Sequence, residues 1–148
     1  MKILVTGANG YLGQGVVKAL LDNGHSVVAA DFKTNYVDDR AEKMDCDLFS
    51  VEDPYTYFGK PDVLLHLAWR DGFVHYSENH IADLPKHYHF LKQMVDAGIA
   101  KIDKPVVAAF KLCLQHFGVF GSDTVKVVIL WGNRDTALEI LLARMAAD

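Results

Sequence analysis

A short apolar run that leads directly into a glycine-spaced turn constrains this chain more than any other feature. Residues 2–13 read Lys-Ile-Leu-Val-Thr-Gly-Ala-Asn-Gly-Tyr-Leu-Gly, and apolar residues then recur at helical spacing through residue 21. Gly7 permits a tight turn, Gly10 lets the backbone approach a phosphate, and Gly13 lets the helix pack closely on the strand. Backbone N–H groups and the positive end of the helix dipole would face an anion. The segment therefore predicts a site for the pyrophosphate of a dinucleotide.

Size and charge favour an ordinary globular domain. The chain has 148 residues, of which 51% are hydrophobic and 23% charged, so it is long enough to bury a core. Its net charge is −4 and it has no basic cluster, which argues against nucleic acid or an anionic membrane as a partner. No apolar run reaches the length of a membrane span, and glycines interrupt the N-terminal one. Cys46 and Cys113 are isolated, as expected of reduced, buried thiols, and a cytoplasmic location is expected.

Strand and helix patterns alternate along the chain. We predict strands at 2–6, 26–30, 41–46, 63–67 and 125–131, helices at 11–23, 83–97, 103–117 and 135–147, and a short helix or turn at 51–58. The strand at 63–67 is continuously apolar, which suits a parallel sheet covered on both faces. The prediction is one α/β domain over residues 1–148. It is a Rossmann-like three-layer sandwich with a parallel sheet of about five strands, in the order 3-2-1-4-5.

These motifs resemble those of the extended short-chain dehydrogenase/reductase family, particularly its NAD-dependent epimerase/dehydratase branch. Thr6 to Gly13 matches the TGxxGxxG fingerprint of that family, and the resemblance covers about residues 1–100. It implies that Asp31, at the end of the second strand, holds the adenosine ribose. A carboxylate there favours NAD over NADP because it repels a 2′-phosphate, although the nearby cation of Lys33 could tolerate that phosphate.

The resemblance also implies the remaining cofactor contacts. Asp47 and Leu48 resemble the pair that contacts adenine, and residues 66–69 (His-Leu-Ala-Trp) resemble the segment that passes the nicotinamide. Asn79 resembles a structural Asn at the start of the next helix. The implied NAD-binding residues are Gly7, Asn9, Gly10, Tyr11, Leu12, Gly13, Asp31, Phe32, Asp47, Leu48, Leu67, Ala68 and Trp69.

After residue 100 the resemblance ends. The family next expects a strand ending in Ser-Ser or Ser-Thr and then a Tyr-x-x-x-Lys pair, which carry the proton transfer. Tyr88 and Lys92 have that spacing, but they lie before the fifth strand, where a surface or interface role is favoured. Catalytic residues are therefore unknown. Residues 101–148 read as a helix-strand-helix that completes the sheet of an epimerase-like half at 1–100. Divergence, truncation, a frameshift or an engineered chimera would each explain this change.

Other polar residues have weaker functional interpretations. His75, His80, His87 and His89 lack the spacing of metal ligands, and His87 and His89 should face different sides of a helix, so no metal site is predicted. His66 is interpreted as a hydrogen-bonded, partly buried histidine. The pair Trp69-Arg70, and also Arg134, could line a cleft at the carboxyl edge of the sheet.

The helix at 83–97 resembles the one that family members use to dimerise. Its apolar stripe at Tyr88, Leu91 and Val95 would serve either a homodimer or packing on the chain's own sheet. Three functional hypotheses follow: an NAD-binding domain without turnover, an active NAD-dependent oxidoreductase or sugar-nucleotide epimerase, and a chimeric scaffold that holds no ligand.

Overall fold

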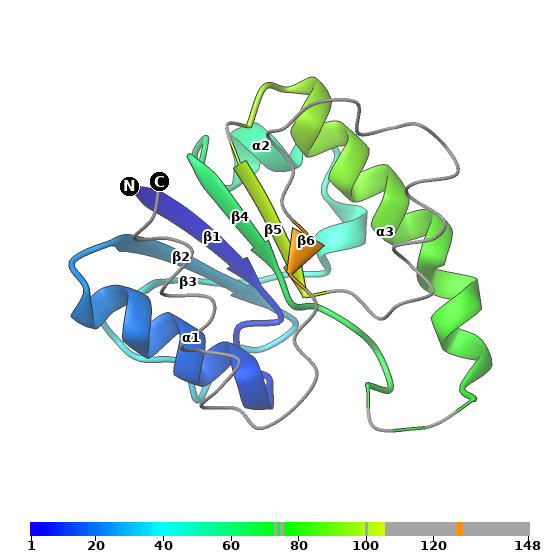
Figure 1. Cartoon of the computed structure of the whole chain (residues 1–148), viewed down its shortest axis with the longest axis horizontal. Helices are drawn as coiled ribbons and strands as arrows, with labels where there is room; N and C mark the ends of the chain where they lie inside the picture. The colour runs from blue at the N-terminus through cyan, green and yellow to red at the C-terminus, as the bar shows by residue number, and fades with distance from the viewer. Residues whose placement is uncertain (73, 75, 100, 106–126, 129–148) are drawn as a thin grey trace.

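A parallel sheet forms the centre of the molecule (Figure 1). The computed structural model describes residues 1–72, 74, 76–99, 101–105 and 127–128. Its strands are β1 (Lys2–Thr6), β2 (Ser26–Asp31), β3 (Glu42–Asp45), β4 (Val63–His66), β5 (Lys101–Pro105) and β6 (Val127–Val128). They lie in the order β3-β2-β1-β4-β5-β6, and every neighbouring pair is parallel.

Helices cover both faces of this sheet. Figure 1 shows α1 (Tyr11–Asp22) on one side and α2 (Pro54–Tyr57) with α3 (Glu78–Asp96) on the other. Because successive strand residues point to opposite faces, Ile3 and Val5 pack in the cluster with α1, whereas Leu4 packs in the cluster with α3. All three are fully buried. The three-layer α/β prediction is confirmed, and the continuous apolar strands are explained by burial on both sides.

The first four predicted strands are confirmed with their order. Residues 101–105 form an additional strand, β5, so the helix predicted at 103–117 is wrong at its start. This strand lies between β4 and β6, and β6 falls within the predicted strand 125–131. The five residues Lys-Ile-Asp-Lys-Pro contain no apolar run, and Asp shortly before Pro is typical of a helix start. The local pattern therefore predicted a helix where the structure has a strand. The rest of the predicted helix 103–117, and the helix 135–147, lie outside the described residues.

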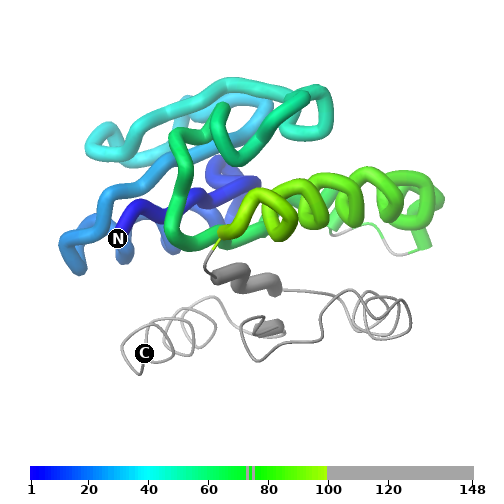
Figure 2. Tube along the Cα trace, turned by 90° about the horizontal axis from the view of Figure 1, so that it is seen from above, coloured from blue at the N-terminus to red at the C-terminus, as the bar shows by residue number. Residues whose placement is uncertain are grey.

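The helix α3 begins earlier than predicted. Its N-cap is Ser77, whose side chain accepts a hydrogen bond from the Asn79 N–H, and Pro85 lies inside the helix rather than at its first turn. Figure 2 shows α3 as a single continuous helix. It ends before Gly98, whose left-handed φ of 89° is typical of a glycine that terminates a helix.

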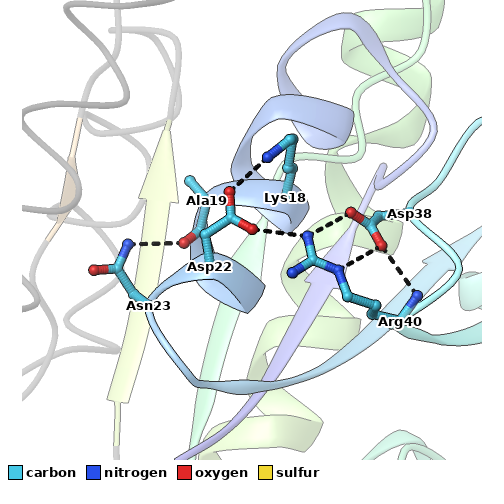
Figure 3. A network of polar contacts seen from close by, with 6 residues as sticks. All are labelled: Lys18, Ala19, Asp22, Asn23, Asp38 and Arg40. Atoms are coloured by element: carbon cyan, nitrogen blue, oxygen red, sulfur yellow. Dashed lines mark hydrogen bonds and ion pairs between the residues drawn. The ribbon is translucent and has the colours of Figure 1, made fainter.

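The loop between β2 and β3 is fastened at its far end to α1. Arg40 donates to Asp22 Oδ1 at 2.8 Å and to Asp38 Oδ2 at 2.7 Å, while Lys18 donates to the other oxygen of Asp22 (Figure 3). These hydrogen bonds hold the pKa of Asp38 and of Asp22 below the ordinary range. Because these groups are largely in contact with solvent, the network mainly restrains the loop and adds little to stability.

Candidate functional site

The glycine turn joins β1 to α1 and excludes side chains. Gly7 has a φ of 68°, and a Cβ built on it would lie 2.6 Å from the Ala68 nitrogen. A Cβ on Gly13 would lie 2.2 Å from the Gly7 oxygen, so α1 packs directly on the turn. Only glycine satisfies both positions, the first through backbone conformation and both through space. These are the roles predicted for the first and third glycines.

The N-terminus of α1 offers backbone donors at the same place. Gly10 is its N-cap and provides no side-chain cap, and no acidic residue lies in the first turn. The first N–H groups of a helix have no intrahelical partner, and here no carboxylate of the first turn competes for them. Tyr11, Leu12 and Gly13 form this first turn, as the fingerprint predicted. The arrangement can bind an anion through the backbone.

Asp31 stands at the carboxyl end of β2, next to the turn. Its Oδ2 accepts from the Asn9 N–H at 2.9 Å and its Oδ1 from the Phe32 N–H at 2.8 Å. Asn9 in turn accepts from the Tyr36 N–H at 2.9 Å, which fastens the near end of the loop between β2 and β3. The Phe32 and Tyr36 side chains are exposed. The structure thus brings together Asn9, Asp31 and Phe32, three of the residues predicted to bind the cofactor.

A cation near Asp31 already has a partner. Lys33 Nζ lies 3.6 Å from Asp45 Oδ2, and the Thr34 hydroxyl donates to Asp45 Oδ1 at 2.7 Å. These contacts lower the pKa of Asp45, with the Thr34 hydrogen bond as the largest cause. Lys33 is therefore directed to a carboxylate at the end of β3.

The predicted adenine residues lie just after β3. Asp47 is the N-cap of a short 3-10 helix, η1 (Leu48–Ser50), and accepts from the Phe49 N–H at 3.0 Å. Leu48 is buried, so of this pair only Asp47 is exposed. An open depression begins at Cys46 and Asp47 and continues along α2 as far as Tyr57. Burial and nearby carboxylates raise the pKa of the Cys46 thiol, with burial as the larger cause.

The segment Leu67–Trp69 leaves β4 beside the glycine turn. Leu67 donates its N–H to the Thr6 oxygen at 3.0 Å, and Ala68 is the residue that a Cβ on Gly7 would strike. All three segment residues are half-buried. Arg70 turns away to α3, where it lies 2.9 Å from Asp83 Oδ2 and donates to Asn79. The segment therefore lies beside the turn, while Arg70 is engaged in an ion pair.

Two buried histidines behind this segment were not predicted as a pair. His66 Nδ1 lies 2.7 Å from Thr6 Oγ1, and His66 Nε2 lies 2.8 Å from His87 Nδ1. Burial lowers the pKa of His87 to about 4, against a smaller opposing effect of the Asp83 charge. His66 was correctly interpreted as a hydrogen-bonded buried histidine. Its partner is 21 residues away on α3, and no local spacing in the sequence indicates such a contact.

The remaining sequence candidates are placed as follows. Lys92 pairs with Asp96 on the exposed side of α3, and Tyr88 packs partly buried against the core with Leu91 and Val95. The apolar stripe thus serves packing on the chain's own sheet, and the homodimer stays a prediction. His87 is buried, whereas His89 is exposed, so the two face different surroundings as expected. His75 and Arg134 lie outside the described residues.

Two kinds of feature are absent from the part of the chain that the structure describes. It holds no group of three or more His, Cys, Asp or Glu side chains arranged to bind a metal ion. None of its helices combines the length and apolar character needed to cross a membrane.

The fold and this site define a class of protein. A parallel sheet in the order 3-2-1-4, a glycine turn between the first strand and helix, and an acidic residue ending the second strand are the features of a Rossmann-type nucleotide-binding fold. Residues 3–98 match the NAD dependent epimerase/dehydratase family. The chain belongs to that family, as the resemblance implied.

A curated relative supports this membership. The chain is 40% identical over 107 residues to dTDP-6-deoxy-L-talose 4-dehydrogenase (NAD(+)) of Aggregatibacter actinomycetemcomitans, covering 69% of this chain and 40% of that protein. A second relative, the uncharacterized protein YLL056C of Saccharomyces cerevisiae, is 33% identical over 85 residues. That match covers 53% of this chain and 27% of the yeast protein. The chain thus spans well under half the length of either relative.

Solved structures share the fold. UDP-glucose 4-epimerase from Thermus thermophilus, in complex with NAD, has a TM-score of 0.67 at 20% identity and covers 86% of this chain and 53% of that chain. MoeE5 in complex with UDP-glucuronic acid and NAD has a TM-score of 0.64 at 20% identity, with coverage of 86% and 52%.

Proposed function

We propose that this chain binds NAD at the edge formed by the glycine turn, Asp31 and residues 67–69. The observation that carries the proposal is the turn itself, where Cβ atoms are excluded at Gly7 and Gly13 beside a helix N-terminus that has no side-chain cap. A turn without side chains lets a ligand come close to the backbone N–H groups of the helix. Membership of an NAD-dependent family supports NAD as that ligand.

Each residue has a role in holding the cofactor. The N–H groups at the start of α1, from Tyr11 to Gly13, would hold the pyrophosphate, and Asp31 would accept from the adenosine ribose. Asp47 and Leu48 would border the adenine, and Leu67, Ala68 and Trp69 the nicotinamide. When bound, the nicotinamide supplies a hydride acceptor or donor.

The contacts of Asp31 and Lys33 favour NAD over NADP. Both oxygens of the Asp31 carboxylate are held by backbone N–H groups, so it cannot turn away from a 2′-phosphate without losing those bonds. Lys33 is paired with Asp45 and would have to leave it to meet the phosphate. The repulsion from Asp31 is thus uncompensated, and NADP is the weaker ligand.

Catalysis is a separate proposal. The Ser and Tyr-x-x-x-Lys context that the family uses is missing from its expected place in the sequence, and Lys92 is engaged with Asp96. We therefore infer that the chain binds NAD without turning over a substrate. The second candidate is oxidation of a dTDP-6-deoxy sugar, favoured by the 40% identity to a dehydrogenase named for that substrate class. A ligand-free chimeric scaffold, with residues 101–148 as the foreign part, is the third.

Calorimetric titration separates these candidates. We expect saturable heat with NAD and NADH, weaker binding of NADP, and a rise in the melting temperature with cofactor. If millimolar NAD produces no heat and no thermal shift, only the ligand-free scaffold remains as a candidate. NADH production from dTDP-6-deoxy-L-talose, followed by absorbance, would establish the second candidate and remove the first.

Asp31→Ala is expected to weaken NAD binding about tenfold, because the ribose loses a charge-assisted hydrogen bond. The same change should narrow the preference for NAD over NADP, since the repulsion from the 2′-phosphate disappears. Asp39→Ala is a matched control, as Asp39 is exposed and pairs with Lys43. Equal affinity of the Asp31→Ala variant and the parent chain for NAD would show that the ribose lies elsewhere.

A further inference from the structure

A line of three buried polar side chains runs beneath the proposed cofactor site. Thr6 ends β1, His66 ends β4, and His87 lies in the middle of α3. Their solvent-exposed fractions are 0%, 7% and 2%. The two contacts, 2.7 Å from Thr6 to His66 and 2.8 Å from His66 to His87, are both within hydrogen-bonding range. None of the three belongs to the proposed cofactor contacts.

Two of the three side chains of this line come from residues adjacent in the chain to those that would contact the cofactor. Thr6 precedes Gly7 in the chain, and His66 precedes Leu67 and Ala68. Thr6 and His66 are paired in register across β1 and β4, as the last rung of that ladder. Above this rung the two chain segments nearly touch, since a Cβ on Gly7 would lie 2.6 Å from the Ala68 nitrogen. The side-chain contact therefore fixes the spacing of the turn and the segment from below.

His87 extends the line to two other parts of the proposed site. Its ring stacks on Trp69, with centroids 4.8 Å apart and planes 28° from parallel. Its ring also makes an edge contact with Phe49 of η1 at 4.7 Å. One side chain of α3 thus touches the nicotinamide segment and the helix that carries Leu48, while it holds the histidine that ends β4.

The two hydrogen bonds of the line require that each contact has one donor and one acceptor. Thr6 can donate to His66, which then donates to His87, or both bonds can run in the opposite direction. Each arrangement leaves one proton on each neutral ring. Asp83, Lys86 and Arg70 are the charged groups around His87, and Asp83 is paired with both cations. Both hydrogen bonds of the line can therefore form while the two rings stay neutral.

We propose that His87 is a positioning residue for dinucleotide binding, acting through His66 and Trp69 to hold residues 67–69 at their distance from the glycine turn. This inference rests on the proposed function, because it assigns a determinant of affinity at the same site. Helix α3 would thus contribute to cofactor affinity as well as packing on the sheet.

Two substitutions of His87 test the proposal. His87→Phe keeps a ring against Trp69 and Phe49 but removes the nitrogen that bonds to His66 Nε2, so we expect the dissociation constant for NADH to rise about tenfold. His87→Asn places an amide near the position of Nδ1 and can restore the bond to His66. It should keep NADH affinity within about threefold of the parent chain. The measurement is NADH fluorescence titration of the full chain.

Two controls separate positioning from stability. Met94→Ala, on the same helix and fully buried, should lower the melting temperature while NADH affinity is retained at a temperature where the variant is folded. His89→Phe should change neither the melting temperature nor the affinity for NADH. Equal weakening of NADH binding in Met94→Ala and His87→Phe, or failure of His87→Asn to rescue, would show a purely structural role and overturn the proposal.

A second pair of variants keeps the test decisive if His87→Phe does not fold. Thr6→Val removes the hydroxyl at the other end of the line, and Thr6→Ser retains it. We expect NADH to bind more weakly to the valine variant alone. Failure of the parent chain itself to bind NADH would reject the proposed function. Normal NADH binding in the parent chain and in both His87→Phe and Thr6→Val would reject this inference only.

Discussion

Gly13→Ala is expected to destabilise the fold by about 2 kcal/mol or more, although alanine is the better helix former by about 1 kcal/mol. The new Cβ would lie 2.2 Å from the Gly7 oxygen and 2.6 Å from the Ala8 oxygen. Both are backbone atoms, which cannot rotate aside as a side chain can. The helix α1 would have to move off the turn. Urea unfolding followed by circular dichroism measures the loss.

Gly10→Ala is the matched comparison. Its Cβ would meet only the Gly7 oxygen at 3.2 Å, and its φ of −71° suits any residue. We expect a smaller loss of stability, about 1 kcal/mol, because alanine is a poor N-cap. NAD binding should nevertheless fall about tenfold or more, since the methyl group occupies the approach of the phosphates. A Gly13→Ala variant as stable as the parent chain would contradict the packing described for α1.

Acidification from about pH 6.5 to pH 4 is expected to remove about 3 kcal/mol of stability through His87 alone. Its pKa is about 4 in the folded chain because of burial, against an ordinary value of 6.5. Between these values the unfolded chain binds the proton and the folded chain does not. The stabilisation is therefore complete above the ordinary pKa, and it is lost as the pH falls towards the pKa of the folded chain.

Urea unfolding at several pH values tests this expectation. The His87→Phe variant should lack the dependence on pH that His87 causes, and His89→Phe should retain it because that side chain is not buried. Carboxylates such as Asp83, whose pKa is lowered chiefly by its hydrogen bond with Lys86, lose their contribution only at lower pH. A His87→Phe variant with the slope of the parent chain would show that His87 is not the responsible group.

The elements with a strong local pattern could be predicted from the sequence. The order 3-2-1-4 followed from the alternation of apolar runs and helical segments. The short helix or turn predicted at 51–58 contains α2, whose N-cap Asp53 accepts from the Thr56 N–H. β5 could not be predicted because charged residues interrupt it, and pairing with β4 and β6 forms a strand that its composition does not favour. The early start of α3 was not predicted, because a proline such as Pro85 is favoured in the first turn of a helix and here lies inside it.

Some residues of the candidate site could likewise be identified from the sequence, whereas others could not. The glycines and Asp31 were identified because their roles depend on backbone conformation and on position at a strand end, which a sequence displays. The contact between His66 and His87 joins β4 to α3, and the Lys33–Asp45 pair joins the end of β2 to the end of β3. Such contacts depend on how elements pack, so residue spacing along the chain does not show them.

The register of the central strand has a consequence for synthesis of the protein. Leu4 is paired with Val28 on one side and with Leu64 on the other. At roughly 5–20 residues per second, a ribosome that has made Leu4 needs about 3–12 seconds to reach the strand that covers its second edge. During that interval this apolar strand of the nascent chain has at least one open edge, and both edges are open until Val28 has been made, so the strand is exposed to pairing with other chains.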